Sequence, residues 1–174
     1  MNNQLITNEI NKNFLTTLTE NLKTCTEFKI CVSFVRISGV QLLMDFFKEL
    51  NAKGVKGQIL ASTYINVTHP QALEMLNSFE NIQLKIFTST SDQGFHAKGY
   101  LFLNPEENNK EKWTIIIGSS NISGAAFKKN VEWNVINNEE VLENREPGVF
   151  AKSVLDDLMN FGTILTPKIF LMSS

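Results

Sequence analysis

The sequence predicts an α/β fold, in which a mixed, mostly parallel β-sheet is flanked by helices on both faces. Two observations lead to this prediction. Apolar residues switch repeatedly between helical and strand spacing, and 43% of the residues, including 13 Phe, are hydrophobic. A chain of 174 residues can bury one sizeable core, so we expect a single domain over residues 1–174.

Several segments carry apolar residues at the spacing of a helix. They are residues 8–23, 38–53, the segment after Thr68-His69-Pro70-Gln71, the short turn 122–127, and the segment that follows Pro147 and ends at Phe161. Gly54 is a natural stop for the second helix. Thr68 and Gln71 have the spacing of a capping box, so we expect His69 to have a capping or surface role.

Other segments have the composition and side-chain period of strands. They are residues 27–34, 56–62, 82–87, 96–103, 113–117 and 130–136. In the last of these, a period of two puts Glu132 and Asn134 on one face and Trp133 on the other. We expect Trp133 to lie in the core.

The chemistry of the chain is predicted to centre on His96. A strand period of two points His96 and Lys98 the same way. Residues 113–117 read as the partner strand of a hairpin whose turn is 104–109, and this strand would deliver Gly118-Ser119-Ser120-Asn121 beside the histidine.

These side chains are suited to attack and hold a phosphodiester. An imidazole can attack phosphorus in one step and donate a proton in the next, while a neighbouring ammonium neutralises the phosphate oxygens. We therefore expect Lys98, Ser119, Ser120 and Asn121 to bind the substrate phosphate. The plainer alternative is a solvent-facing histidine and lysine followed by a turn that merely starts a helix.

These motifs resemble those of the phospholipase D-like superfamily, whose signature is His-x-Lys followed by Gly-Ser-x-Asn. The resemblance is greatest to its single-motif nuclease branch, found in restriction endonucleases of phospholipase D type and at the N-terminus of bacterial superfamily-two helicases. It implies a phospholipase D-like fold over most of the chain. The matching stretches are Val32-Ser33-Phe34, Ser38-Gly39, residues 95–102, residues 116–121 and Glu132-Trp133-Asn134.

The resemblance also implies the roles of the site residues. In nucleases of this superfamily, a Glu eleven residues after the motif Asn hydrogen-bonds the catalytic His, and Glu132 stands eleven residues after Asn121. Leu103 replaces the Asp of the signature, which the superfamily's nucleases commonly lack. The expected catalytic residues are His96, Lys98, Ser119, Asn121 and Glu132.

The expected mechanism places a constraint on the assembly. One histidine must attack phosphorus and another must protonate the leaving oxygen, whereas the chain has one His-x-Lys. We therefore expect a homodimer in which both copies of His96 face one phosphate, with no metal and no cofactor. The predicted function is a metal-independent phosphodiesterase or nuclease that cuts DNA through a phosphohistidine intermediate.

Composition limits the remaining possibilities. The net charge of −2 and pI of about 5.7 mean that any DNA contact is local. Cys25 and Cys31 are expected to be buried free thiols. No apolar run reaches membrane-spanning length and no signal segment opens the chain, so we expect a cytoplasmic protein without a membrane partner. Cationic residues that could line one face for DNA are Arg36, Lys53, Lys56, Lys98, Lys128 and Lys129.

Two other functions remain compatible with the sequence. The domain could be a non-catalytic DNA-binding or positioning module, fused to or associated with a helicase or restriction system. The chain ends soon after Thr166-Pro167-Lys168, so residues 1–174 could also be a fragment of such a protein. The second alternative is a lipid phosphodiesterase, which is disfavoured because no amphipathic membrane-binding stretch is present.

Overall fold

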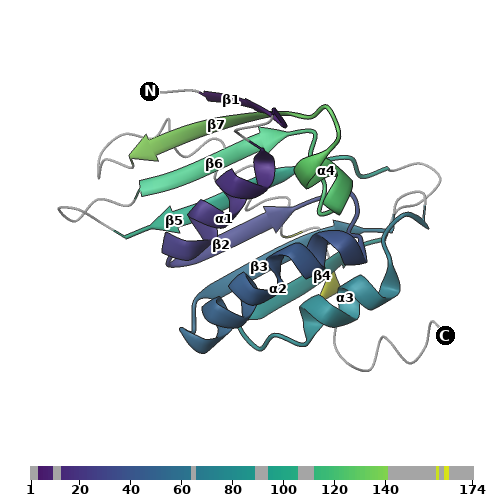
Figure 1. Cartoon of the computed structure of the whole chain (residues 1–174). Coiled ribbons are helices and arrows are strands. Elements are labelled where there is room, and N and C mark those ends of the chain that lie inside the picture. The colour runs from purple at the N-terminus through teal and green to yellow at the C-terminus, as the bar shows by residue number, and fades with distance from the viewer. Residues whose placement is uncertain are drawn as a thin grey trace.

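A computed structural model describes residues 4–9, 13–63, 66–88, 94–105, 112–140, 160 and 163–164 (Figure 1). Strands and helices alternate up to residue 87, as predicted. The elements are β1 (Gln4–Thr7), α1 (Phe14–Thr24), β2 (Glu27–Cys31), α2 (Ile37–Ala52), β3 (Lys56–Ser62), α3 (Pro70–Asn77), β4 (Ile82–Phe87), β5 (Gly99–Asn104), β6 (Lys112–Gly118), α4 (Gly124–Lys128), β7 (Trp133–Glu140) and β8 (Thr163–Ile164).

The described strands form one sheet of eight strands, in the order β1-β7-β6-β5-β2-β3-β4-β8. The sheet is mixed, as predicted, but the expectation that it is mostly parallel is wrong. Among the described strands, only the pairs β2–β3 and β3–β4 are parallel. The reason is that β5, β6 and β7 follow one another as antiparallel neighbours, which short connections allow, whereas parallel pairs need a crossover helix.

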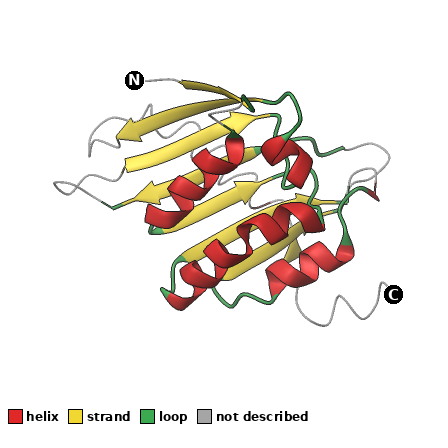
Figure 2. Cartoon of the chain, in the orientation of Figure 1, coloured by secondary structure: helices red, strands yellow, loops and turns green. Residues whose placement is uncertain are grey.

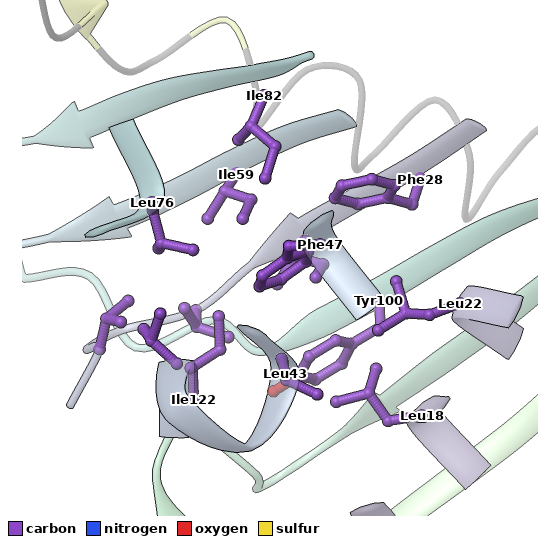
Figure 3. Close-up of a cluster of buried hydrophobic side chains, with 14 of the residues drawn as sticks. Leu18, Leu22, Phe28, Leu43, Phe47, Ile59, Leu76, Ile82, Tyr100 and Ile122 are labelled. Atoms are coloured by element: carbon purple, nitrogen blue, oxygen red, sulfur yellow. The ribbon is translucent and has the colours of Figure 1, made fainter. Parts of the chain in front are cut away.

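The four described helices lie over one face of the sheet, so the expectation of helices on both faces is not met among the described residues (Figures 1 and 2). Their apolar side chains and those of the covered sheet face make one buried cluster, part of which is drawn in Figure 3. Phe14 of α1 illustrates the packing, because its ring meets Tyr100 of β5 edge-on at 5.1 Å and lies 5.8 Å from Phe127 of α4. The helix predicted from Pro147 to Phe161 lies outside the described residues except for Asn160, which is helical.

The opposite face of the sheet carries a second, smaller buried cluster. It consists of Cys31, Leu60, Phe87, Phe95, Leu101, Trp113 and Ile115, with Ala97 and Leu103 packed against it. The period of two in β5 therefore holds as predicted, because Tyr100 and Phe102 belong to the helix-covered cluster while Leu101 belongs to the second one. Both cysteines are buried free thiols, as predicted.

The beginning of the chain differs from the prediction. The helix expected from Asn8 begins at Phe14, after the N-cap residue Asn13, whose side chain accepts a hydrogen bond from the backbone of Thr16. Asn8 instead joins this segment to α4 (Gly124–Lys128), because its Nδ2 donates to the carbonyl of Ala126 at 2.7 Å. The short strand β1 was not predicted.

The start of α3 confirms one expectation and corrects another. His69 is the N-cap residue, and its Nδ1 accepts a hydrogen bond from the backbone N–H of Gln71 at 3.2 Å, so the capping role is confirmed. The proposed capping box is wrong. Thr68 lies outside the helix, and its hydroxyl donates to the carbonyl of Ser62 at 2.6 Å.

Trp133 is 68% exposed, so the expectation that it lies in the core is wrong. The predicted alternation in β7 is correct, because Glu132 and Asn134 are buried. The face of β7 that carries Trp133, however, is not part of the second buried cluster. β7 is the second strand from one edge of the sheet, next to the edge strand β1. Exposed apolar side chains gather there on three neighbouring strands, and we call them the apolar patch: Leu5, Ile117, Trp133 and Val135.

Candidate active site

The five predicted catalytic residues lie at one edge of the sheet. His96 and Lys98 come just before β5, Ser119 and Asn121 follow β6, and Glu132 precedes β7. Because β5 and β6 are antiparallel, and β6 and β7 are antiparallel, these ends meet on the same side, to the right in Figure 1. The two halves of the motif are therefore brought together as predicted.

His96 and Lys98 are in direct contact. The Nζ of Lys98 lies 2.8 Å from Nδ1 of His96 and donates to the carbonyl of His96 at 2.7 Å. Both residues precede the first residue of β5, so the strand predicted to begin at His96 begins three positions later, at Gly99. The shared direction of the two side chains is nevertheless confirmed. His96 is exposed at the edge, where a substrate can reach its ring.

Lys98 is buried, with only 7% of its surface exposed to solvent. Burial lowers the pKa of Lys98, and the negative charge of Glu132 opposes this shift. A partly desolvated ammonium has few water molecules to shed before it binds a phosphate oxygen. Its electrostatic attraction for an anion is correspondingly strong.

Glu132 contacts Ser119, whereas the resemblance implies that it binds His96. Its Oε2 accepts a short hydrogen bond from the Ser119 hydroxyl, and its Oε1 accepts one from Nδ2 of Asn130 at 3.3 Å. The backbone N–H of Trp133 in turn donates to the Ser119 hydroxyl at 3.0 Å. The carboxylate thus fixes Ser119 while its charge acts on Lys98. Asn130 is a site residue that the sequence reasoning missed, and its spacing of two from Glu132 is the signal that could have found it.

Asn121 connects the site to the helix layer. Its Oδ1 accepts a hydrogen bond from the backbone N–H of Phe34 at 3.0 Å, and Asn121 is largely buried. With the oxygen engaged, Nδ2 is the part of the amide that can donate to a phosphate. The neighbouring residues form a bridge between Val35 and Ile122, so the segment after β2 holds the segment after β6. Sequence alone could not assign this role to a backbone N–H.

Gly39 permits α2 to lie directly against this segment. A Cβ atom at Gly39 would come within 2.5 Å of the backbone carbon of Ile122 and of the nitrogen of Ser123. No side chain can be accommodated there without moving the backbone that carries Asn121. The Ser38-Gly39 pair therefore supports the site geometrically.

Ser120 points away from the substrate side, into the protein. It is fully buried, its Oγ accepts a hydrogen bond from Nδ2 of Asn134 at 2.9 Å, and its carbonyl accepts one from the Tyr100 hydroxyl at 2.8 Å. The expected contact of Ser120 with the substrate phosphate would require it to leave Asn134. In this structure Ser120 anchors the loop that carries Ser119 and Asn121. Gly118 allows the same close packing, because a Cβ there would collide with Asn134.

The cationic residues predicted to line one face are divided between the two ends of the sheet. Arg36, Lys128 and Lys129 lie in the segments at the same edge as His96, whereas Lys53 ends α2 and Lys56 begins β3 at the other edge. All five of these side chains are exposed. Within the described ranges, no group of three or more His, Cys, Asp or Glu side chains is arranged to hold a metal ion.

Comparison with known proteins places this arrangement in a family. Residues 18–147, more than half of the chain, match the family model described as "Cardiolipin synthase, PLD-like domain". The chain belongs to the phospholipase D-like family. No curated protein sequence matches it significantly. None of the described helices of this phospholipase D-like chain is long and apolar enough to cross a membrane.

Solved structures share the phospholipase D-like fold at low sequence identity. Nuc from Salmonella typhimurium, a phospholipase D family member, aligns with a TM-score of 0.64 and 19% identity over 94% of this chain and 97% of its own. NucT from Helicobacter pylori aligns with a TM-score of 0.62 and 17% identity over 94% and 99%. Yeast tyrosyl-DNA phosphodiesterase gives a TM-score of 0.64 at 12% identity, and the 92% of this chain that aligns spans 38% of that protein.

Proposed function

We propose that this phospholipase D-like chain is a phosphodiesterase that cleaves DNA through a covalent phosphohistidine intermediate. The observation that carries the proposal is the exposed imidazole of His96 in contact with the buried ammonium of Lys98. Ser119 and Asn121 lie at the same edge, and both can donate hydrogen bonds to the same phosphate once the Ser119 hydroxyl leaves Glu132. The fold shared with Nuc and with tyrosyl-DNA phosphodiesterase supports phosphodiester chemistry on nucleic acid.

The reaction has two steps in this proposal. The unprotonated ring nitrogen of one His96 attacks phosphorus, and the leaving sugar oxygen takes a proton from a second, protonated imidazole. Water then attacks the phosphohistidine and gives its proton to that second imidazole, which restores both rings. Lys98 and Asn121 stabilise the charge on the non-bridging oxygens. The Ser119 hydroxyl leaves Glu132 in one of two ways. It donates to the phosphate, or it moves aside so that the His96 ring contacts the Glu132 carboxylate.

The second imidazole comes, in this proposal, from a second copy of the chain. The only other histidine, His69, is occupied in capping α3, and it lacks a neighbouring lysine motif. The apolar patch is the surface we assign to the dimer. It begins beside the site, because Ser119 and Trp133 exchange backbone and side-chain hydrogen bonds. Exposed apolar surface of this kind is typical of protein interfaces.

The chemistry is tested by incubating the protein and its His96→Ala variant with labelled DNA in the presence of a chelator. Wild-type protein should cut the DNA, while the variant should lose at least about 100-fold in rate. Loss of cleavage on chelation, or an active variant, would refute the histidine mechanism. DNA binding without cleavage by the wild type would favour a positioning module. Cleavage of phosphatidylglycerol vesicles but not of DNA would assign the apolar patch to a lipid substrate.

The shared site is tested with mixed dimers and a patch variant. If wild-type and His96→Ala chains are co-refolded, activity should fall with the square of the wild-type fraction, because a working site needs both histidines. A linear fall would refute the shared site. Light scattering should show that Trp133→Glu is a monomer, and the DNA assay should show that it is inactive. Ile164→Glu is the matched control, since Ile164 is exposed on β8 at the other side of the sheet, and it should remain dimeric and active.

A further inference from the structure

A pocket of about 480 Å³ lies beside the candidate active site, on the side of the helix layer. It is lined in part by Phe34 and Arg36 from the segment after β2, by His69 at the start of α3, and by Asn130 before β7. A volume in this range is typical of sites that hold one small molecule or one nucleotide. No step of the proposed cleavage reaction uses this pocket or the side chain of Arg36.

Two hydrogen bonds join the pocket walls to candidate catalytic residues. The backbone N–H of Phe34 donates to Asn121, and the side chain of Asn130 donates to Glu132. Arg36 is held in the same way, because its backbone N–H donates to the carbonyl of Ile122, next to Asn121, at 2.8 Å. The pocket and the active site are therefore adjacent, and a substrate strand that crosses one would reach the other.

The lining combines one cation with neutral donors and apolar surface. Arg36 is exposed, its side chain makes no capping hydrogen bond to α2, and no ion pair involving it occurs among the described residues. The lining includes no Asp or Glu from the described part of the chain. His69 uses Nδ1 as an acceptor for Gln71, so its neutral ring carries the proton on Nε2 and can donate it.

These properties fit a unit that has both a phosphate and a flat ring. A guanidinium binds phosphate through two parallel hydrogen bonds, which a surface lysine cannot do. The Phe34 side chain offers an aromatic surface to a base or sugar, and stacking of this kind is sequence-tolerant because every base has a flat face. The chain has a net charge of −2, so an arginine with no ion pair among the described residues gives a local anchor for a polyanion beside the site.

We propose that this pocket is a subsite for the nucleotide adjoining the scissile phosphate, with Arg36 binding the phosphate of that nucleotide. The inference rests on the proposed nuclease function and adds to it a determinant of substrate choice. Arg36 acts on binding and not on the reacting atoms. Substrates that extend past the scissile phosphate gain from the subsite, while diesters without a second phosphate do not.

Two substrates separate this subsite from the chemistry. The Arg36→Gln variant should raise the KM for a short oligothymidylate about tenfold and change kcat by less than about twofold. On bis(p-nitrophenyl) phosphate, which has no second phosphate, kcat/KM should be unchanged. Arg36→Lys should recover part of the loss, because it keeps the charge without the planar donors. Lys53→Gln is the matched control, since it removes an exposed cation at the other end of α2, and it should leave both substrates unaffected.

Each remaining outcome has a distinct meaning. An unchanged KM for the oligothymidylate in Arg36→Gln would overturn the subsite. Equal losses on both substrates would also overturn it, because Arg36 would then act on the reaction centre or the fold. If the wild type cleaves neither substrate, the proposed nuclease function fails. Fluorescence titration with 5′-phosphorylated dithymidylate then decides the subsite, which stands if Arg36→Gln binds at least about fivefold more weakly and falls if the two proteins bind equally.

Discussion

At the scale of single residues, the site places a cation where the protein interior disfavours it. Lys98 is nearly closed off from solvent and its pKa is lowered by burial, yet its ammonium contacts His96 and lies within the field of Glu132. Strained electrostatics of this kind are frequent at functional sites, because the group is placed for the substrate and not for the resting fold. In the proposed function, the substrate phosphate adds a second negative charge beside Lys98 to that of Glu132.

This arrangement predicts opposite effects of Lys98→Met on activity and stability. Cleavage should fall by at least about 100-fold, since the charge that stabilises the phosphate oxygens is removed. The free energy of unfolding at pH 7 should equal that of wild type or exceed it by about 1 kcal/mol, because no charge has to be desolvated. Urea titration measures the second quantity. A clear loss of stability would assign Lys98 a structural role.

The pH dependence of stability, compared between wild type and Lys98→Met, shows independently whether the Lys98 charge stabilises or destabilises the fold. A lysine whose folded pKa is lowered holds its proton less well in the fold, so its unfavourable contribution is present below the folded pKa. It disappears as the pH rises to the unfolded value of 10.5. The stability of wild type relative to Lys98→Met should therefore increase over that range.

The meeting of the candidate site residues at one edge could be predicted from the sequence, but their hydrogen-bond partners could not. His96, Lys98, Ser119, Asn121 and Glu132 all reach one edge. The bond from Glu132 to Ser119 and the one from the Phe34 backbone to Asn121 join segments whose approach depends on the packing of the whole sheet. A sequence pattern records which side chains are available and contains no information on such tertiary contacts.

At the scale of elements, the order of helices and strands was predictable because the helices carry apolar residues at helical spacing and the strands are short apolar runs. The errors occur where a local pattern competes with a tertiary contact. Thr68 had the spacing of a helix cap, but the Ser62 carbonyl takes its hydroxyl, and His69 caps instead. Trp133 had the alternation of a core residue, but alternation cannot tell which face of a strand is covered.

The contact between α2 and the segment after β6 predicts the effect of Gly39→Ala. The added methyl would collide with the backbone of Ile122 and Ser123, so α2 or the segment that carries Asn121 must move. We expect a loss of about 1–3 kcal/mol in the free energy of unfolding, together with reduced cleavage under conditions where the variant is still folded. Thermal unfolding and the DNA assay measure the two effects.

Gln41→Ala serves as the control for this experiment. Gln41 is exposed on the same helix, so its truncation should leave both stability and cleavage near the wild-type values. If Gly39→Ala behaved like Gln41→Ala, the close approach of α2 would not determine the position of Asn121.

At the scale of the whole molecule, one sheet with two buried clusters holds two thiols away from water. Burial raises the pKa of Cys25 to about 11 and that of Cys31 to about 12, from an ordinary value of 9.0. Thiols with raised folded pKa values stabilise the fold fully below pH 9. This contribution is lost as the pH rises through the folded values, because only the unfolded chain can ionise them easily.

Alkaline titration of stability tests this conclusion. Between pH 9 and 11 the free energy of unfolding should decrease by about 1.4 kcal/mol per pH unit for each thiol. A Cys25→Ala/Cys31→Ala variant should lack that decrease, although it starts from a lower stability because of the cavities created. Equal slopes in the two proteins would mean that the thiols ionise as readily in the fold as in the unfolded chain.

The two ends of the β5–β6 hairpin differ in how much change in sequence and length they can accept. Its open end presents His96 and Ser119, while the paired residues Asn104 and Lys112, between which the chain connects the two strands, lie at the opposite end. Insertions or deletions in that connection leave the register of the paired strands intact, so they do not displace the reacting groups. The length and sequence of that connection can therefore change, and new contacts can be added through it, without moving the candidate active site.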